Sequence, residues 1–174
     1  MGKVMAICIS EIRGVQKKNV HTARLIENWG VEHDAHAGNW HRQVSLLSYE
    51  TIQDFNRQGA GVIDGAFGEN LVVSGYDFTK MKIGTRFRCG DVVLELTQIG
   101  KECHNGCEIF KKMGKCIMPT NGVFTKVIHG GVISEGQRLK GSVKRLKQIC
   151  NFCLIRDAVN RFFSLKKSIR VRKQ

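Results

Sequence analysis

The segment "GTRFRCGDVVLELTQIG" (residues 84–100) decides the fold class. Arg86 to Arg88 form a first strand, the Cys89-Gly90-Asp91 segment forms a turn, and a second strand starts at Val92. Val92, Leu94 and Leu96 alternate with other residues, which places them on one face of that strand. The segment therefore predicts a β-hairpin with one buried face.

Further short apolar runs surround this hairpin. The runs "VMAICIS" (4–10), "RQVSLLS" (42–48) and "NLVVSG" (70–75) also predict strands, and the chain has 19 glycines but one proline. Before residue 142, helical spacing appears in "SYETIQDFNRQG" (48–59) and "CEIFKKMG" (107–114), each followed or closed by a glycine stop signal. Without an alternating strand–helix rhythm, the pattern favours a mainly β protein, a barrel with a few short peripheral helices.

Length and charge bound the function. A chain of 174 residues predicts one core, and no run of about 18 apolar residues or signal peptide is visible, so we expect a cytoplasmic protein without a transmembrane segment. The net charge is +13, and residues 142–174 hold ten Lys and Arg against one Asp. Apolar residues at helical spacing in this tail predict a basic helical extension, with weak contact to nucleic acid or an anionic surface as one role. The chain does not contain the G-x-S-x-G pattern that surrounds the nucleophilic serine of many hydrolases, which disfavours a hydrolase of this kind.

The segment "IGKECHNGCEIFKKMGKCIMP" (99–119) carries the clearest chemical signal. It holds Cys103, His104, Cys107 and Cys116 among several lysines. A cytoplasmic protein keeps thiols reduced, so a disulfide is disfavoured. Three alternatives stay open: a zinc site, cysteines that fill the core, and a thiolate that nearby lysines stabilise as a nucleophile or soft metal ligand.

Four longer strings resemble one family. They are "VEHDAHAGNWHRQVSLLSYE" (31–50), "DGAFGENLVVSGYDF" (64–78), the stretch from "KIGTRF" to "KVIHGG" (82–131), and "GVISEGQRL" (131–139). Together they resemble small, free-standing members of the MOSC domain family, named for the C-terminal domain of molybdenum cofactor sulfurases. The resemblance implies a MOSC-type β-barrel over residues 1–141, followed by the basic extension over 142–174.

The resemblance also implies chemistry. It suggests a molybdenum cofactor (molybdopterin) protein, an oxidoreductase that reduces N-hydroxylated compounds, with Cys103 as catalytic residue and molybdenum ligand. Cys107 and Cys116 would be auxiliary thiols. By the same resemblance, the cofactor-binding residues would be His36, His41, Arg42, Phe67, Gly68, Glu69, Asn70 and Lys101.

An alternative function uses the same thiol. Cys103 would accept a persulfide, making the protein a sulfur carrier or a cofactor-handling module that needs a cysteine desulfurase, since no pyridoxal phosphate motif is visible. The oxidoreductase would instead need an external electron donor and a small-molecule substrate. One departure from the family is His33, where glycine is usual, and we expect it to alter the local backbone.

Overall fold

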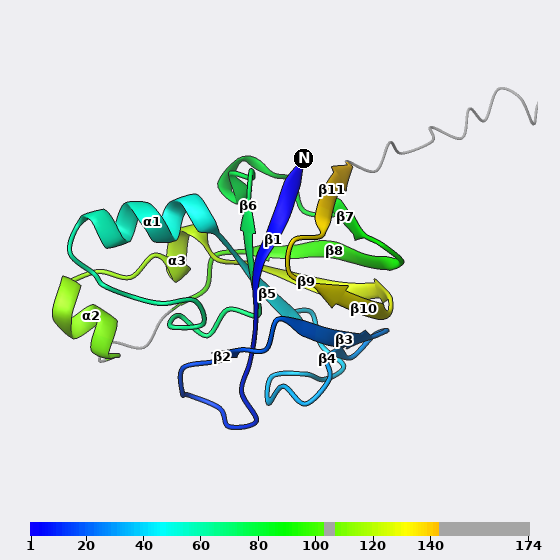
Figure 1. The fold of residues 1–174 in the computed structure, drawn as a ribbon, viewed down its shortest axis with the longest axis horizontal. Coiled ribbons are helices and arrows are strands. Elements are labelled where there is room, and N and C mark those ends of the chain that lie inside the picture. Colours follow the sequence, from blue (N-terminus) through cyan, green and yellow to red (C-terminus); the bar gives the residue numbers. More distant parts are fainter. Residues whose placement is uncertain (103–106, 143–174) are drawn as a thin grey trace, which may run out of the picture. The chain divides into compact units, whose positions relative to one another are not determined.

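A seven-stranded β-barrel forms the centre of the structure, which is a computed structural model describing residues 1–102 and 107–142 (Figure 1). The strands follow the order β11-β7-β8-β9-β5-β6-β1, and the pairing of β11 with β1 closes the barrel. All neighbours are antiparallel except β5 and β6, which are parallel. The bounds are β1 Gly2–Ile9, β5 Val44–Ser48, β6 Leu71–Ser74, β7 Arg86–Cys89, β8 Val92–Ile99, β9 Val123–His129 and β11 Arg138–Ser142. The predicted mainly β barrel is confirmed.

Shorter strands extend this barrel. β2 (Lys18–Asn19) pairs with the end of β1, and a three-stranded sheet has the order β10-β3-β4. Its strands are β3 (Thr22–Ile26), β4 (Gly30–Val31) and β10 (Gly131–Ser134).

The hairpin that opened the sequence analysis is β7–β8. Phe87 lies opposite Leu94, and Cys89 lies opposite Val92, so the turn consists of Gly90 and Asp91 alone. The prediction counted Cys89 in the turn, whereas the structure makes it the last residue of β7. Gly90 has a φ of 58°, which a two-residue hairpin turn requires.

The helices are few and lie at one side of the barrel (Figure 1). α1 (Tyr49–Arg57) starts after Ser48, whose side chain caps the backbone N–H of Thr51, and α2 (Glu108–Met113) ends at Gly114 with a φ of 68°. Both helices were predicted, with Gly59 and Gly114 as their stop signals. The remaining ones are the 3₁₀ helix η1 (Phe78–Lys80) and α3 (Met118–Asn121).

Two apolar clusters stabilise the fold. One fills the barrel and includes Leu46, Phe87 and Leu94, and the other lies between the barrel wall and α1 and includes Leu47 and Phe55. β5 is buried along its whole length because it faces both clusters. This explains why its sequence is a continuous apolar run rather than an alternating one.

Two predicted features lie outside the described residues. They are Cys103 with His104, and the basic extension from residue 143 onward. Within the part of the chain that the structure describes, no helix is long and apolar enough to cross a membrane.

Candidate functional site

The predicted site segments meet at the neighbouring strands β1, β6, β5, β9 and β8. Ile7 of β1 pairs with Leu71 of β6. Their neighbours Cys8 and Asn70 are also in contact, because the backbone N–H of Cys8 donates to the Asn70 carbonyl at 2.7 Å. Ser45 pairs with Phe124, and Phe124 pairs in turn with Gln98. The strings around residues 36–42, 67–70 and 98–101 are therefore neighbours in space although they are far apart in sequence.

Glu69 is fully buried in the turn before β6. Its Oε1 accepts a hydrogen bond from the backbone N–H of Gly65 at 2.7 Å, and its Oε2 accepts one from Phe67 at 3.0 Å. Burial raises the pKa of Glu69 to about 7, although the hydrogen bond from Gly65 opposes this change. With both oxygens facing its own turn, Glu69 shapes the loop that contains Gly68 and Phe67. The Phe67 ring is buried in the apolar cluster under α1, next to the ring of Phe55.

Asn70 holds three strands together. Its Oδ1 accepts hydrogen bonds from the backbone N–H and the hydroxyl of Ser45 at 3.1 and 3.0 Å, and its Nδ2 donates to the carbonyl of Cys8 at 3.1 Å. Since the side chain is buried, these bonds satisfy groups that water cannot reach. Asn70 thus fixes the register of β1, β5 and β6 beneath the predicted site.

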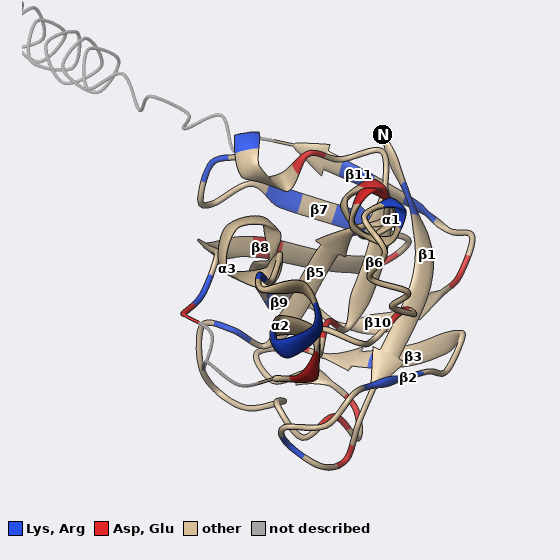
Figure 2. Ribbon diagram, turned by 90° about the vertical axis from the view of Figure 1, so that its left-hand side faces the viewer, with Lys and Arg blue, Asp and Glu red and all other residues tan. Residues whose placement is uncertain are grey.

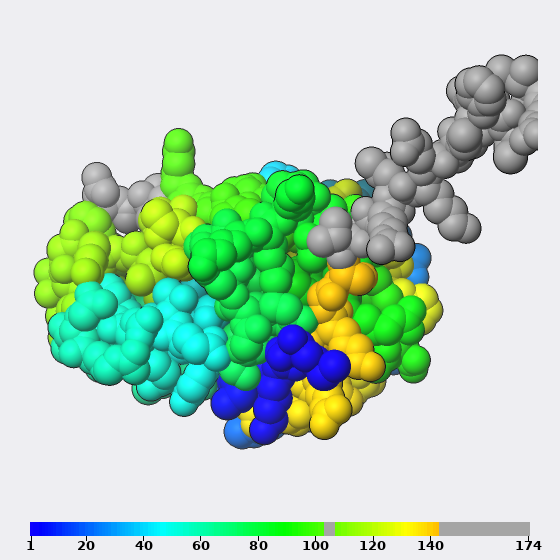
Figure 3. Space-filling view, turned by 90° about the horizontal axis from the view of Figure 1, so that it is seen from above, coloured from blue at the N-terminus to red at the C-terminus, as the bar shows by residue number. Residues whose placement is uncertain are grey.

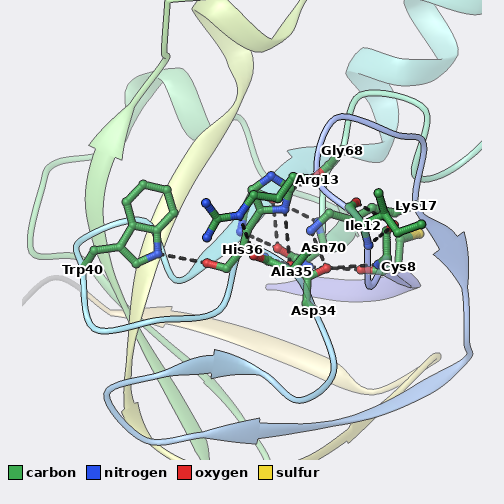
Figure 4. Close-up of polar contacts among 12 residues, drawn as sticks. Cys8, Ile12, Arg13, Lys17, Asp34, Ala35, His36, Trp40, Gly68 and Asn70 are labelled. Atoms are coloured by element: carbon green, nitrogen blue, oxygen red, sulfur yellow. Dashed lines mark hydrogen bonds and ion pairs between the residues drawn. The ribbon is translucent and has the colours of Figure 1, made fainter.

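A buried ion pair that the sequence analysis did not identify lies beside these residues. Lys17 Nζ is 2.7 Å from Asp34 Oδ2, and both side chains are 1% exposed. Asp34 also accepts hydrogen bonds from the backbone N–H groups of Ser10 at 3.2 Å and His36 at 3.0 Å. Figure 4 shows Lys17 and His36 beside Asp34. The carboxylate therefore joins the loop after β1 to the loop that contains His36.

The ion pair changes the protonation of its members. Burial would raise the pKa of Asp34, but contacts from His36 and Lys17 outweigh it and hold that pKa well below its usual range. Burial lowers the pKa of Lys17, and the Asp34 carboxylate opposes this decrease. Burial, with Glu69 as the next cause, raises the pKa of the Cys8 thiol to about 12. Cys8 is consequently a protonated core thiol near neutral pH.

A close backbone approach holds the same loop in place. The backbone N–H of Lys17 donates to the Gly65 carbonyl at 3.0 Å, and a Cβ atom on Gly65 would lie 2.2 Å from the Lys17 carbonyl oxygen. Gly65 also has a φ of 89°. Only glycine allows this contact, which links the turn of Glu69 to the ion pair of Asp34.

His36 and His33 occupy the same loop but differ in environment. His36 Nδ1 is 3.6 Å from Asp34 Oδ1, too long for a hydrogen bond but close enough for an ion pair, and its side chain is 38% exposed. His33 is exposed and has a φ of 62°. This φ lies in the left-handed region, which glycine adopts more readily than histidine.

Arg42 is the most unusual residue of the site. Its Cζ lies 4.8 Å from the centre of the Trp40 ring and 5.6 Å from that of the Phe124 ring. Its Nε is buried and has no hydrogen-bond partner among the described residues. No carboxylate within residues 1–102 and 107–142 forms an ion pair with it. Arg42 is a cation held by two aromatic rings and available to an anion.

The remaining predicted residues lie at the end of β8 and beyond. His41 Nε2 donates to Gln98 Oε1 at 2.9 Å, since the amide nitrogen of Gln98 already donates to the Gly100 carbonyl at 2.6 Å. Lys101 is half-buried and follows directly. His41 therefore lies next to the end of β8, which comes a few residues before Cys103 in the sequence.

The auxiliary thiols flank α2. Cys107 is exposed and caps this helix, because its Sγ accepts a hydrogen bond from the Phe110 backbone N–H at 3.4 Å. Cys116 is half-buried and packs against the apolar cluster under α1. Two of the lysines predicted to crowd a thiolate bind elsewhere: Lys112 Nζ donates to the Ala60 carbonyl and Lys115 Nζ to Gln58 Oε1. The zinc alternative depends on Cys103 and His104, which lie outside the described residues.

Comparison with known proteins gives a family and a fold. The family model for the MOSC domain matches residues 33–140. The search of curated proteins gave no match.

Several solved structures share the fold. The YuaD protein from Bacillus subtilis is 18% identical, with a TM-score of 0.68 over 81% of this chain and 96% of its own. YiiM from Geobacillus stearothermophilus is 20% identical, with a TM-score of 0.62 over 84% of this chain and 78% of its own. YiiM from Escherichia coli is 19% identical, with a TM-score of 0.57 over 82% of this chain and 70% of its own.

Proposed function

Because the chain belongs to the MOSC domain family, whose members are associated with the molybdenum cofactor, we propose that it binds molybdopterin and reduces N-hydroxylated compounds. The match covers most of the barrel and includes both loops of the candidate site. The observation that carries this proposal is the environment of Arg42.

Arg42 fits an anionic ligand such as the phosphate of a pterin cofactor. A guanidinium group without a carboxylate partner keeps all its donors available, and its planar fork matches phosphate oxygens. The rings of Trp40 and Phe124 limit its rotamers, so little side-chain entropy is lost when an anion binds. The buried Nε without a partner is the kind of group that a bound ligand satisfies.

The other residues have distinct proposed roles. His41 and Lys101 would contribute further donors beside Arg42, and His36 would contribute one from the Asp34 loop. Gly68 would line the site on the turn that Glu69 fixes, with Asn70 beneath it and with the buried Phe67 supporting the turn from the apolar cluster under α1. Cys103 would supply the thiolate ligand of the metal.

When bound, the cofactor supplies the two-electron reduction that removes oxygen from an N-hydroxylated compound and leaves an amine and water. The chain itself shows no motif for a flavin, haem or iron–sulfur group. Electrons would therefore come from a separate donor protein. The tasks left to the chain are to bind the cofactor, orient it and tune it through hydrogen bonds from the residues around it.

The test measures cofactor content. Protein purified without oxygen from a host that makes the cofactor should contain molybdenum and pterin, and Arg42→Gln should lose most of both. Arg24→Gln is a matched control, because Arg24 is exposed on β3 and outside the site. Arg42→Gln with unchanged pterin content would contradict the assignment of Arg42.

Cys103→Ser separates the two proposed roles of the thiol. In the oxidoreductase, this variant should keep pterin but lose reduction of a hydroxylamine or amidoxime substrate with an added electron donor. Protein that lacks molybdenum but gains a sulfur atom on Cys103 after incubation with a cysteine desulfurase would instead establish the sulfur-carrier alternative. Mass spectrometry of the intact chain distinguishes these outcomes.

A further inference from the structure

The outer face of β1, β11 and β7 carries a cluster of basic side chains that the proposed function does not use. We call this set the basic face; it consists of Lys3, Arg88, Arg138 and Lys140. All four residues are exposed, while their strand neighbours Phe87 and Leu139 are buried in the barrel. The alternation fixes the direction of the four side chains, because neighbouring residues of a strand point to opposite faces.

The register places like charges directly opposite each other. Lys3 is the partner of Arg138 between β1 and β11, and Lys140 is the partner of Arg88 between β11 and β7. Opposed residues have Cβ atoms about 5 Å apart, and Arg138 and Lys140 are two positions apart on one strand, about 7 Å. Four positive charges therefore share a small area of one sheet.

This arrangement is unfavourable for the isolated protein. Like charges that face each other across two strands destabilise a sheet. None of the four side chains has an ion pair or side-chain hydrogen bond among the described residues, in contrast to Arg86, whose Nε is 2.7 Å from Glu95 Oε2. A cluster of this kind is relieved by a partner that brings negative charge.

The views of the structure agree with this placement. Figure 3 shows the N-terminal residues in blue and β11 in orange as one continuous surface with the green residues of the β7 region. Figure 2 shows the basic positions of β7 in blue. None of the candidate site residues lies on β7 or β11, so a partner on the basic face would leave the site accessible.

We propose that the basic face binds the phosphodiester backbone of a nucleic acid. Two of its four cations are arginines, which bind phosphate oxygens in a bidentate manner. The outward positions of β7 and β11 are otherwise Arg86 and Ser142, so they offer no apolar side chain to insert into a bilayer. Stable attachment to a lipid surface needs an apolar group in addition to charge, which favours the phosphodiester partner.

The sequence adds charge of the same sign directly after β11. β11 ends at Ser142, and residues 143–174 continue the chain with ten Lys and Arg against one Asp. Binding through the tail alone is a competing explanation. It predicts that substitutions on the basic face leave the salt dependence of binding unchanged.

The experiment measures how binding of the full chain to a fluorescent single-stranded oligonucleotide depends on salt. Each phosphate contact contributes about −0.7 to the slope of log K against log salt concentration. The double variant Arg88→Gln/Lys140→Gln should therefore have a slope that is shallower by about 1.4. Arg88→Lys/Lys140→Arg keeps the charges and should retain the slope of the unmodified chain.

A matched control removes the same charges elsewhere. Lys18→Gln/Arg24→Gln changes one lysine and one arginine that are exposed on β2 and β3 and form no ion pair among the described residues. Its slope should not change. The proposal would be overturned if the unmodified chain and Arg88→Gln/Lys140→Gln had equal slopes, or if the control lowered the slope as much as that variant. Binding to anionic phosphatidylserine vesicles without binding to the oligonucleotide would overturn it as well.

Discussion

Removal of the Asp34 carboxylate should strongly destabilise the protein. In Asp34→Asn, an amide NH₂ in place of Oδ2 would face two donors, Lys17 Nζ at 2.7 Å and the Ser10 N–H at 3.2 Å. Lys17 would then be a buried ammonium without a counter-charge. Breaking a buried pair by removing one partner costs about 3–5 kcal/mol, and we expect a loss of this size in the free energy of unfolding at pH 7.

Urea unfolding monitored by circular dichroism measures this loss. Asp77→Asn is the control, because it removes an aspartate from an exposed ion pair with Lys80 and should leave the free energy of unfolding unchanged. The double variant Asp34→Asn/Lys17→Met should recover most of the stability, since it removes the stranded charge. A cost for Asp34→Asn below about 1 kcal/mol would refute the claim that this pair is a buried electrostatic contact.

The pH dependence gives an independent check. The folded pKa of Asp34 lies below the value of 3.8 for an ordinary aspartate, so its ionised form stabilises the folded state. This contribution is fully present above the unfolded pKa and is lost as the pH falls toward the folded pKa. The stability difference between the unmodified chain and Asp34→Asn should therefore be constant from pH 5 to pH 7 and become smaller below about pH 4.

Three further outcomes follow from the described residues. His33→Gly should raise the free energy of unfolding by up to about 1 kcal/mol in urea, because glycine relieves the left-handed conformation at φ 62°; a loss would contradict this. Glu69 has a folded pKa of about 7 against an ordinary 4.5, so the unfolding free energy should fall by up to about 3 kcal/mol as pH rises between these values, and Glu69→Gln should abolish this slope. Arg88→Gln should stabilise the chain by about 0.2–1 kcal/mol at low salt by removing the repulsion with Lys140, and an effect that persists in 1 M salt would rule out electrostatics as its cause.

The strands and helices could be predicted because their signals are local. Val92, Leu94 and Leu96 alternate along one strand, and Gly59 and Gly114 mark the ends of helical segments. Each signal depends on residues that are close in sequence. The prediction differed at Cys89, since pairing with Val92 depends on the register of two strands rather than on local preference.

The candidate site was accessible to sequence analysis only through resemblance. Arg42 was named as a cofactor contact, but the sequence could not show that Trp40 and Phe124 hold it, because Phe124 is 82 positions away. Lys17 and Asp34 were missed for a related reason. A lysine after a polar turn and an aspartate in a loop normally lie at the surface. Here the contact of Lys17 with the Gly65 turn and the bond from the Ser10 N–H to Asp34 bring both into a buried position.

The amino-acid sequence by itself determined the mainly β architecture, the positions of the turns and helix ends, and the family, since these follow from local patterns and from strings that match in order. Tertiary structure decided the charge environment. It buried the Lys17–Asp34 pair, left Arg42 without a carboxylate partner among the residues that the structure describes, and set Lys3 against Arg138 and Lys140 against Arg88. Burial and the distance between charges depend on residues far apart in the chain, and only the closed barrel brings these residues together.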